Sequence, residues 1–216
     1  MVVATETIFG RIVTGHDVEQ WALAVLHKWS STYLAEVERQ HGYEAGHLQR
    51  FRGWAIGPTF DKWPEDQVPG VLVVSAGTAG RPVKDADKSY RTRWQLQVGC
   101  LASARTQKLS HEHAHMYTTA CRVALLQKQS LEGWAAGTDW LGDRYDPLAY
   151  DDTRSLYAGY ADLTVEVRDV ATVTAGPTEP DDPLEPDTLP WPLPPLVETV
   201  ETEIEQTYPH DEGGTA

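Results

Sequence analysis

The sequence predicts an α+β fold in which a mostly antiparallel sheet packs against two long helices, followed by an extended, acidic, Pro-rich C-terminal tail. Two segments, 17–41 and about 110–132, carry apolar residues at helical spacing. Two others, 90–102 and 156–170, alternate apolar and polar residues as half-buried strands do. Segregated helices with hairpin-like strands favour an α+β sandwich with a mostly antiparallel sheet.

The first helix is predicted over 17–41. Apolar residues recur every three or four positions from Val18 to Val37, which places them on one helix face. Asp17 stands three residues before Gln20, as in a capping box at a helix start. Gly42 is the natural C-terminal stop. The aromatic residues of this stripe are predicted to be core.

A loop dense in Gly, Pro and Trp is predicted over 53–70, followed by a short buried strand at 71–74. The Gly-rich turn at 77–80 ends that strand; because it lacks the Lys-Ser/Thr ending and a following helix, it is not predicted to bind phosphate. The clearest strand covers 90–102. Its predicted buried face consists of Trp94, Leu96, Val98 and Cys100.

The second helix is predicted to begin at Ser110 as its N-cap and to end at Gly133. Residues 134–147 are predicted to form a short strand and a loop, and 156–170 the last strand. The two cysteines, Cys100 and Cys121, fall on apolar faces, so two buried free thiols are predicted.

The net charge of −14 is concentrated at the C-terminal end. Residues 177–216 hold eleven Asp and Glu and no Lys or Arg, which leaves 21 acids against 18 bases in the rest of the chain. Such a body lacks the clustered basic surface that DNA wrapping needs. An acidic surface would repel DNA, which suits a channel wall better than a binding site.

The predicted boundary divides a body, 1–175, from a tail, 176–216. Nine of the 14 prolines lie in the tail, and the run 190–195 (PWPLPP) favours extended polyproline geometry. Alone, such a segment cannot bury enough apolar surface to stay ordered. We expect either an arm that docks along a neighbouring subunit or a solubilising end.

No apolar run approaches the ~20 residues that span a bilayer, so no membrane partner is predicted. The segment Met1 to Gly10 has no basic region followed by an apolar stretch. A secretory signal is therefore not predicted, and the chain is expected to stay in the cytoplasm in which it is made.

One motif indicates catalysis. The residues HEHAH at 111–115 match the H-E-x-x-H pattern of zinc proteases. On a helix, His111 and His115 lie one turn apart and could share a metal ion, with Glu112 as general base.

Three observations oppose a catalytic zinc site. The predicted N-cap, Ser110, would place the motif at the very start of the helix. The extended motif needs Gly and His where this chain has Thr118 and Cys121. Glu112 in a first turn is favoured by the helix dipole without any metal. We therefore predict no catalytic residue and no cofactor, with His111 and His115 as the only candidates for a bound metal.

The second half of the body resembles a known family in the order of its segments and in their residue composition. These are an alternating strand ending in small residues (94–104), a helix half rich in Ala and Leu (121–126), the segments 130–133 and 140–147, and a last strand ending TVEVRDV (164–170). Together they look like the tail terminator proteins of long-tailed bacteriophages, particularly those of actinobacteria. The resemblance covers about residues 15–172.

This resemblance implies a structural virion protein, located in the tail or neck and assembled in the host cytoplasm. It implies a hexameric ring that caps the tail tube and joins it to the head–tail connector proteins, with double-stranded DNA passing through the lumen without sequence-specific binding. It implies no catalytic residues. The alternatives are another head–tail connector or neck protein and, from a different class, a zinc metallopeptidase that uses the motif at 111–115.

A closed ring requires heterologous contacts between copies. The plausible contact segments are 53–70, 134–150 and the tail, where aromatic residues of the type that anchors interfaces occur. The candidate interface residues are Trp54, Trp63, Trp140, Tyr145, Tyr150 and Trp191.

Overall fold

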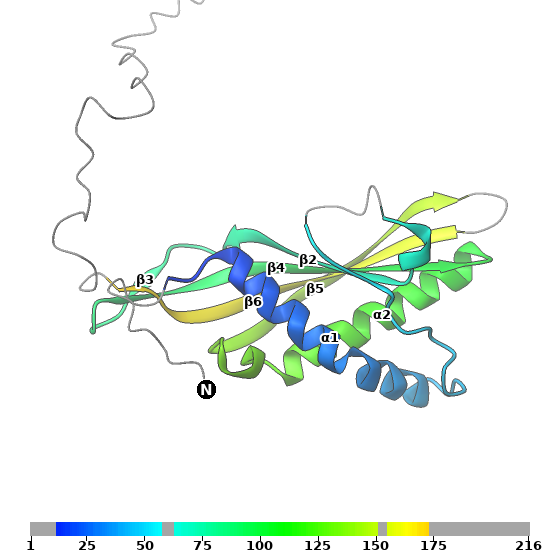
Figure 1. Cartoon of the computed structure of the whole chain (residues 1–216), viewed down its shortest axis with the longest axis horizontal. Helices are drawn as coiled ribbons and strands as arrows, with labels where there is room; N and C mark the ends of the chain where they lie inside the picture. The colour runs from blue at the N-terminus through cyan, green and yellow to red at the C-terminus, as the bar shows by residue number, and fades with distance from the viewer. Residues whose placement is uncertain (1–11, 58–62, 151–154, 173–216) are drawn as a thin grey trace, which may run out of the picture. The chain divides into compact units, whose positions relative to one another are not determined.

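Two helices lie on one face of a six-stranded sheet, as Figure 1 shows. The computed structural model describes residues 12–57, 63–150 and 155–172, all of which belong to one compact unit. The predicted α+β class, with a mostly antiparallel sheet packed against two helices, is confirmed. The predicted tail lies outside the described residues.

The helices are α1 (Gly15–Gln40) and α2 (Gln107–Gln127), with two short 3-10 turns, η1 (Glu65–Gln67) and η2 (Leu131–Gly133). The strands are β1 (Gly53–Ile56), β2 (Gly70–Thr78), β3 (Val83–Lys84), β4 (Ser89–Ala104), β5 (Gly137–Tyr150) and β6 (Ser155–Thr172). Their order in the sheet is β1-β2-β4-β6-β5, with β3 paired to β4. Only the β1–β2 pair is parallel among the described strands. The chain therefore leaves β4 through α2, forms the edge strand β5 and returns into the sheet as β6.

The start of α1 differs from the prediction by three residues. Thr14, not Asp17, is the N-cap, and Asp17 closes the capping box as the third helical residue. The backbone N–H of Thr14 donates to the Asp17 carboxylate at 2.7 Å, and the Thr14 hydroxyl accepts from the Asp17 N–H at 3.3 Å. The Thr14 hydroxyl also donates to the Asp17 carboxylate at 2.6 Å, and this hydrogen bond, followed by that from the Thr14 N–H, lowers the pKa of Asp17. At the other end Gly42 has φ +73°, as predicted for a helix stop.

The alternation predicted for the two long strands is confirmed. Leu96, Val98 and Cys100 of β4 and their neighbours on β6 are buried against the helices. Cys100 and Cys121 are both free and buried, as predicted. Burial raises the pKa of the Cys121 thiol, so both the charge and the reactivity of a thiolate are suppressed there.

The predicted bounds of the second helix are wrong at both ends. Thr106 is the N-cap, with its hydroxyl accepting from the Leu109 N–H at 3.3 Å, and the helix ends at Gln127. Ser110 is fully buried inside the helix. Its hydroxyl donates to the Ser155 carbonyl at 2.8 Å and accepts from the Ala104 N–H at 2.9 Å, so it joins α2 to the ends of β4 and β6.

A segment predicted as a loop, 53–70, contains a strand, and the segment predicted as a short strand and a loop, 134–147, is mostly strand. Residues 53–56 form β1, and 137–150 form one 14-residue strand. β5 tolerates Gly, Pro and charged residues because it is an edge strand, where one side of the backbone needs no sheet partner. Two β-bulges, at Leu141 and Leu148, interrupt its pairing with β6.

The helix α2 approaches the sheet closely at Gly159 of β6. A β-carbon at this position would overlap the Thr118 hydroxyl of α2 and lie 3.0 Å from the Ala114 carbonyl oxygen. The absence of a side chain therefore permits the helix to lie directly on the strand.

We expect Gly159→Ala to destabilise the protein by about 1–3 kcal/mol, because the methyl group forces α2 away from β6. Gly137→Ala in β5 is the matched control, since a β-carbon there meets nothing within 4 Å. Urea unfolding of both variants measures the difference. Equal stability of the two variants would contradict the close approach.

Candidate interaction surfaces

The histidine motif lies on α2, but not at its start. Because the helix begins at Gln107, His111 is its fifth residue, and Glu112 is outside the first turn. The Nε2 atoms of His111 and His115 are 2.9 Å apart. The Tyr43 hydroxyl donates to the Glu112 carboxylate, which raises the pKa of Tyr43.

His113 lies on the other side of the helix and belongs to a different cluster. It packs edge-on to His47 at 5.4 Å between ring centroids and faces Tyr117. Burial, and then the charge of His47, lower its pKa. Among residues 12–57, 63–150 and 155–172, no group of three or more His, Cys, Asp or Glu side chains is placed to hold a metal ion. The metallopeptidase hypothesis needs a third protein ligand, which this part of the chain does not supply.

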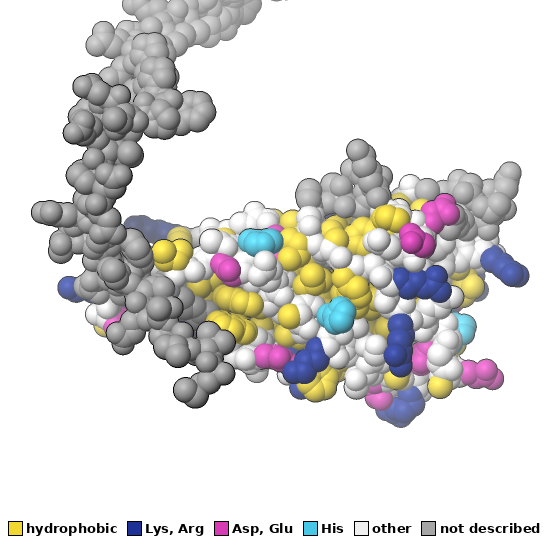
Figure 2. Space-filling model, in the orientation of Figure 1, with side chains coloured by type: hydrophobic (Ala, Val, Ile, Leu, Met, Phe, Trp, Pro, Cys, Tyr) yellow, Lys and Arg dark blue, Asp and Glu magenta, His cyan; other side chains and the backbone are white. Residues whose placement is uncertain are grey.

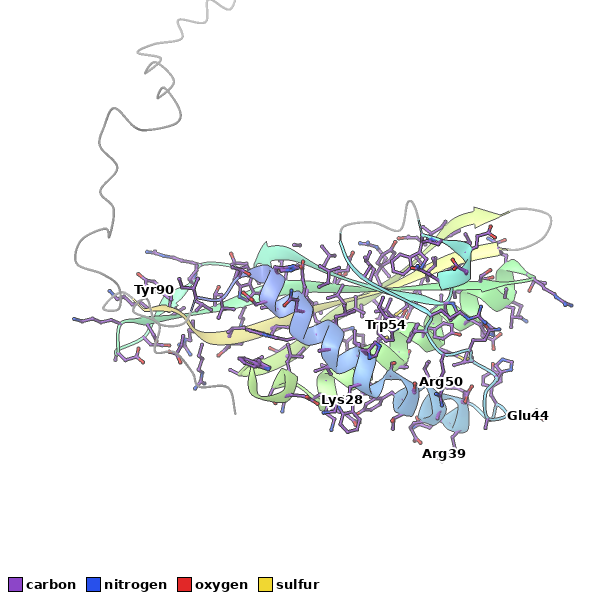
Figure 3. The ribbon with its side chains drawn as sticks, viewed as in Figure 1. Lys28, Arg39, Glu44, Arg50, Trp54 and Tyr90 are labelled. Carbon is purple, nitrogen blue, oxygen red and sulfur yellow. The ribbon has the colours of Figure 1, made fainter. Side chains whose placement is uncertain are left out.

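Two of the candidate interface tryptophans pack within the chain. Trp54 of β1 lies beside α1, where its ring is 5.0 Å from His27 and 5.4 Å from Phe51 (Figure 3). Trp63 covers Gly53 and Gly70, and its indole N–H donates to the Gln67 carbonyl at 3.0 Å. Both rings are partly buried, so each has at least a packing role.

Trp140 and Tyr145 of β5 meet α2 around one ion pair. Arg122 of α2 pairs with Asp143 and lies 4.3 Å from the Trp140 ring centre. The Trp140 indole N–H and the Tyr145 hydroxyl also donate to Asp143, at 2.9 and 3.2 Å. Burial, followed by the charge of Asp143, raises the pKa of Tyr145 to about 12. Half of Trp140 (49%) nevertheless stays exposed.

The remaining two candidates are not placed. The side chain of Tyr150 and all of Trp191 lie outside the described residues. Their role in an interface therefore stays a prediction.

The structure adds two leucines that sequence reasoning missed. Leu141 and Leu148 stand at the two bulges of β5, and 62% and 44% of their surfaces are exposed. A bulge leaves one extra residue without a partner on the neighbouring strand and redirects its side chain. Alternation in the sequence does not reveal where a bulge falls, so these residues carried no recognisable signal.

A second aromatic surface forms where η2 meets α1. The rings of Trp21 and Trp134 stack at 5.4 Å, and 53% of Trp134 is exposed. The preceding residues, Leu131 and Glu132, have left-handed backbone angles, φ +45° and +60°. Glu132 accepts hydrogen bonds from Lys28 and the Trp29 indole, which hold this turn against α1. Figure 2 shows hydrophobic side chains gathered on this side of the molecule.

The sheet face opposite the two described helices is polar at its centre. Gln97 donates to Asp162 at 2.7 Å, and Arg93 pairs with Glu166 at 3.2 Å across β4 and β6. Gln97 is neutral, so the Asp162 carboxylate keeps its charge, and Arg93 borders a hollow that Arg81 and Arg91 also line. None of the described helices is long and apolar enough to cross a membrane.

Comparison with known proteins yields no family. No family model matches the chain, and no curated protein is similar to it. A chain in a solved structure described as the virion of a native gene transfer agent particle aligns with 61% of this chain and 91% of its own length, at 13% identity and a TM-score of 0.38. A likeness this distant carries no argument about function.

We expect Asp143→Ala to cost about 2 kcal/mol of stability, because it leaves the largely buried Arg122 without its partner. Asp146→Ala is the control on the same strand, since its pair with Arg144 is half exposed and should contribute less than about 0.5 kcal/mol. Chemical denaturation measures the free energy of unfolding of the two variants. A smaller loss for Asp143→Ala than for Asp146→Ala would show that Asp143 does not organise this region.

Proposed function

We propose that the chain is a structural virion protein of the tail-terminator class, which forms a ring on the end of a phage tail tube and carries out no catalysis. The resemblance in the order of strands and helices over about 15–172 supports this class. The confirmed α+β body has helices on one sheet face, and within the described residues part of the other face is open, the rest being covered where Trp63 and Val68 pack over Leu72 and Leu101. It provides a compact subunit for such a ring.

The single observation that carries the proposal is the exposed edge of β5. This strand is 14 residues long, and within the described residues it pairs through one edge only, with β6. Charged side chains, proline and β-bulges usually keep such an edge from pairing with another strand, and β5 has Pro147 and two bulges. We therefore propose a contact through the side chains of β5 and not through its backbone. Here Arg122 neutralises Asp143, Asp146 neutralises Arg144, and the two bulges expose leucines.

The exposed leucines and Trp140 give this edge the composition of an interface core. Fully burying one exposed leucine side chain contributes roughly 1.5–3 kcal/mol, so Leu141 and Leu148, already partly buried, supply only part of what association costs. The rest of the contact must come from Trp140 and from other surfaces of the subunit. We propose that the β5 edge of one copy meets a different surface of the next copy. Such a heterologous contact closes into a ring when the rotation per subunit divides a full turn.

The open sheet face suits the wall of a DNA channel. On this face Arg93 pairs with Glu166, and Gln97 donates a hydrogen bond to Asp162. Gln97 and Asp162 present an amide and a carboxylate at its centre, and the arginines gather at one end, where Arg81 and Arg91 line a hollow with Arg93. We propose that DNA passes over this face without sequence-specific contacts. We place the tail tube protein on one side of the ring, the head–tail connector on the other, and the C-terminal tail as an arm toward one of them.

We expect the wild-type protein to form a particle of about six chains, as the resemblance implies, and the double variant Leu141→Asp/Leu148→Asp to remain a monomer. Val83→Asp is the matched control, because Val83 is a similarly exposed (48%) apolar residue on β3, away from β5. Mass measurement by light scattering and negative-stain electron microscopy report assembly. Unfolding curves check that all three proteins are equally stable.

A wild-type protein that stays monomeric at high concentration and in the presence of its tube protein would overturn the proposal. A ring that persists in the double variant would reject the β5 edge as its contact. Adding the ring to polymerising tube protein distinguishes a tail terminator from another neck protein. A terminator stops tube growth, whereas another neck protein leaves growth unchanged.

A further inference from the structure

Two histidines on the outer side of α2, the exposed His111 and the partly buried His115, contact each other. His111 and His115 lie four residues apart on the helix, and their Nε2 atoms are 2.9 Å apart. Their rings are nearly perpendicular, at 84°. We propose that this pair is a two-histidine site for a divalent transition-metal ion, with a preference for the cis geometry of Cu²⁺ or Ni²⁺ over tetrahedral Zn²⁺.

Neighbouring aromatic rings hold both imidazoles in place. Tyr145 of β5 stacks on His115 at 3.5 Å and 19°, and Tyr157 of β6 packs against His111 at 4.8 Å. Tyr145 is itself held by its hydrogen bond to Asp143. A pair that is already ordered loses little side-chain entropy when it binds a ligand.

Without a metal, the two Nε2 atoms lie at hydrogen-bond distance, 2.9 Å, and a metal ion would replace that hydrogen bond. At metal–nitrogen bonds of about 2.0–2.1 Å, the same separation gives an angle of about 90° at the metal. Square-planar and tetragonal ions such as Cu²⁺ and Ni²⁺ take this angle, and nitrogen ligands in general bind Cu²⁺ most tightly.

The surroundings leave room for the other ligands of such an ion. The pair borders an open hollow, whose other lining residues are His41, Tyr43, Lys108, Glu112, Met116 and Thr119. Glu112 accepts a hydrogen bond from Tyr43, and the Lys108 cation adds some repulsion. Water completes the coordination. The site is therefore a binding site with two protein ligands, and the proposal includes no hydrolytic step.

The test is a titration of the full chain, expressed without a histidine tag and stripped with chelator, with CuCl₂, NiCl₂ and ZnCl₂ in separate calorimetry experiments. We expect one ion per chain, tightest for Cu²⁺, and Ni²⁺ bound more tightly than Zn²⁺. His111→Ala and His115→Ala should each weaken binding at least tenfold. His27→Ala is the matched control, as an exposed histidine on α1, and should leave the affinity unchanged.

Electron paramagnetic resonance of the Cu²⁺-loaded protein should show two nitrogen ligands in the wild type and fewer in His111→Ala. Unchanged affinity in both single variants overturns the site, whatever the behaviour of the protein in ring assembly. Zn²⁺ binding tighter than Ni²⁺ overturns the cis geometry. An effect of His41→Ala as large as that of His111→Ala would mean a third histidine ligand and would likewise overturn the two-ligand site.

Discussion

The close approach of α2 to β6 is the constraint on which the rest of this structure depends. Gly159 offers no side chain, so Thr118 and Ala114 of the helix lie directly on the strand. The buried hydroxyl of Ser110 ties the same helix to the ends of β4 and β6. Small residues and one buried hydroxyl thus set the distance and direction of α2 across the sheet. The position of α2 in turn determines where the side chains on the outer side of this helix lie.

One consequence is the surface shared by α2 and β5. The crossing brings Arg122 to Asp143 and His115 to Tyr145. These contacts pair the charges and stack the rings on the helix-facing side of β5, while the bulge leucines at 141 and 148 stay exposed. The edge strand is therefore held rigidly by the helix and still presents apolar side chains outward, a combination that suits an assembly contact.

The proposed ring contact and the proposed metal site are neighbours. Trp140 of the contact lies against Arg122 of α2, and Tyr145 of the same strand stacks on His115 of the histidine pair. Neither needs a catalytic group. Both rely on side chains held in place before a partner arrives, which lowers the entropy lost on binding.

The sequence by itself determined the fold class, the two long helices, the alternation of β4 and β6 and the burial of both cysteines. Each of these depends on local periodicity, which the chain carries residue by residue. It also identified the His111–His115 pair, because four residues on a helix always make one turn. It missed the real start of α2, since Thr106 and the buried Ser110 are both plausible caps until Ser155 supplies a partner.

Only the tertiary structure decided the character of β5 and of the aromatic candidates. The segment 134–147 is predicted to be a short strand and a loop because of its Gly, Pro and charged residues. Only pairing with β6 makes 137–150 one strand with bulges at Leu141 and Leu148. Trp54 and Trp63 pack inward and Trp140 remains half exposed because of what lies beside them, not because of their own chemistry. Exposure, register and bulge position are properties of long-range pairing, and no local pattern records them.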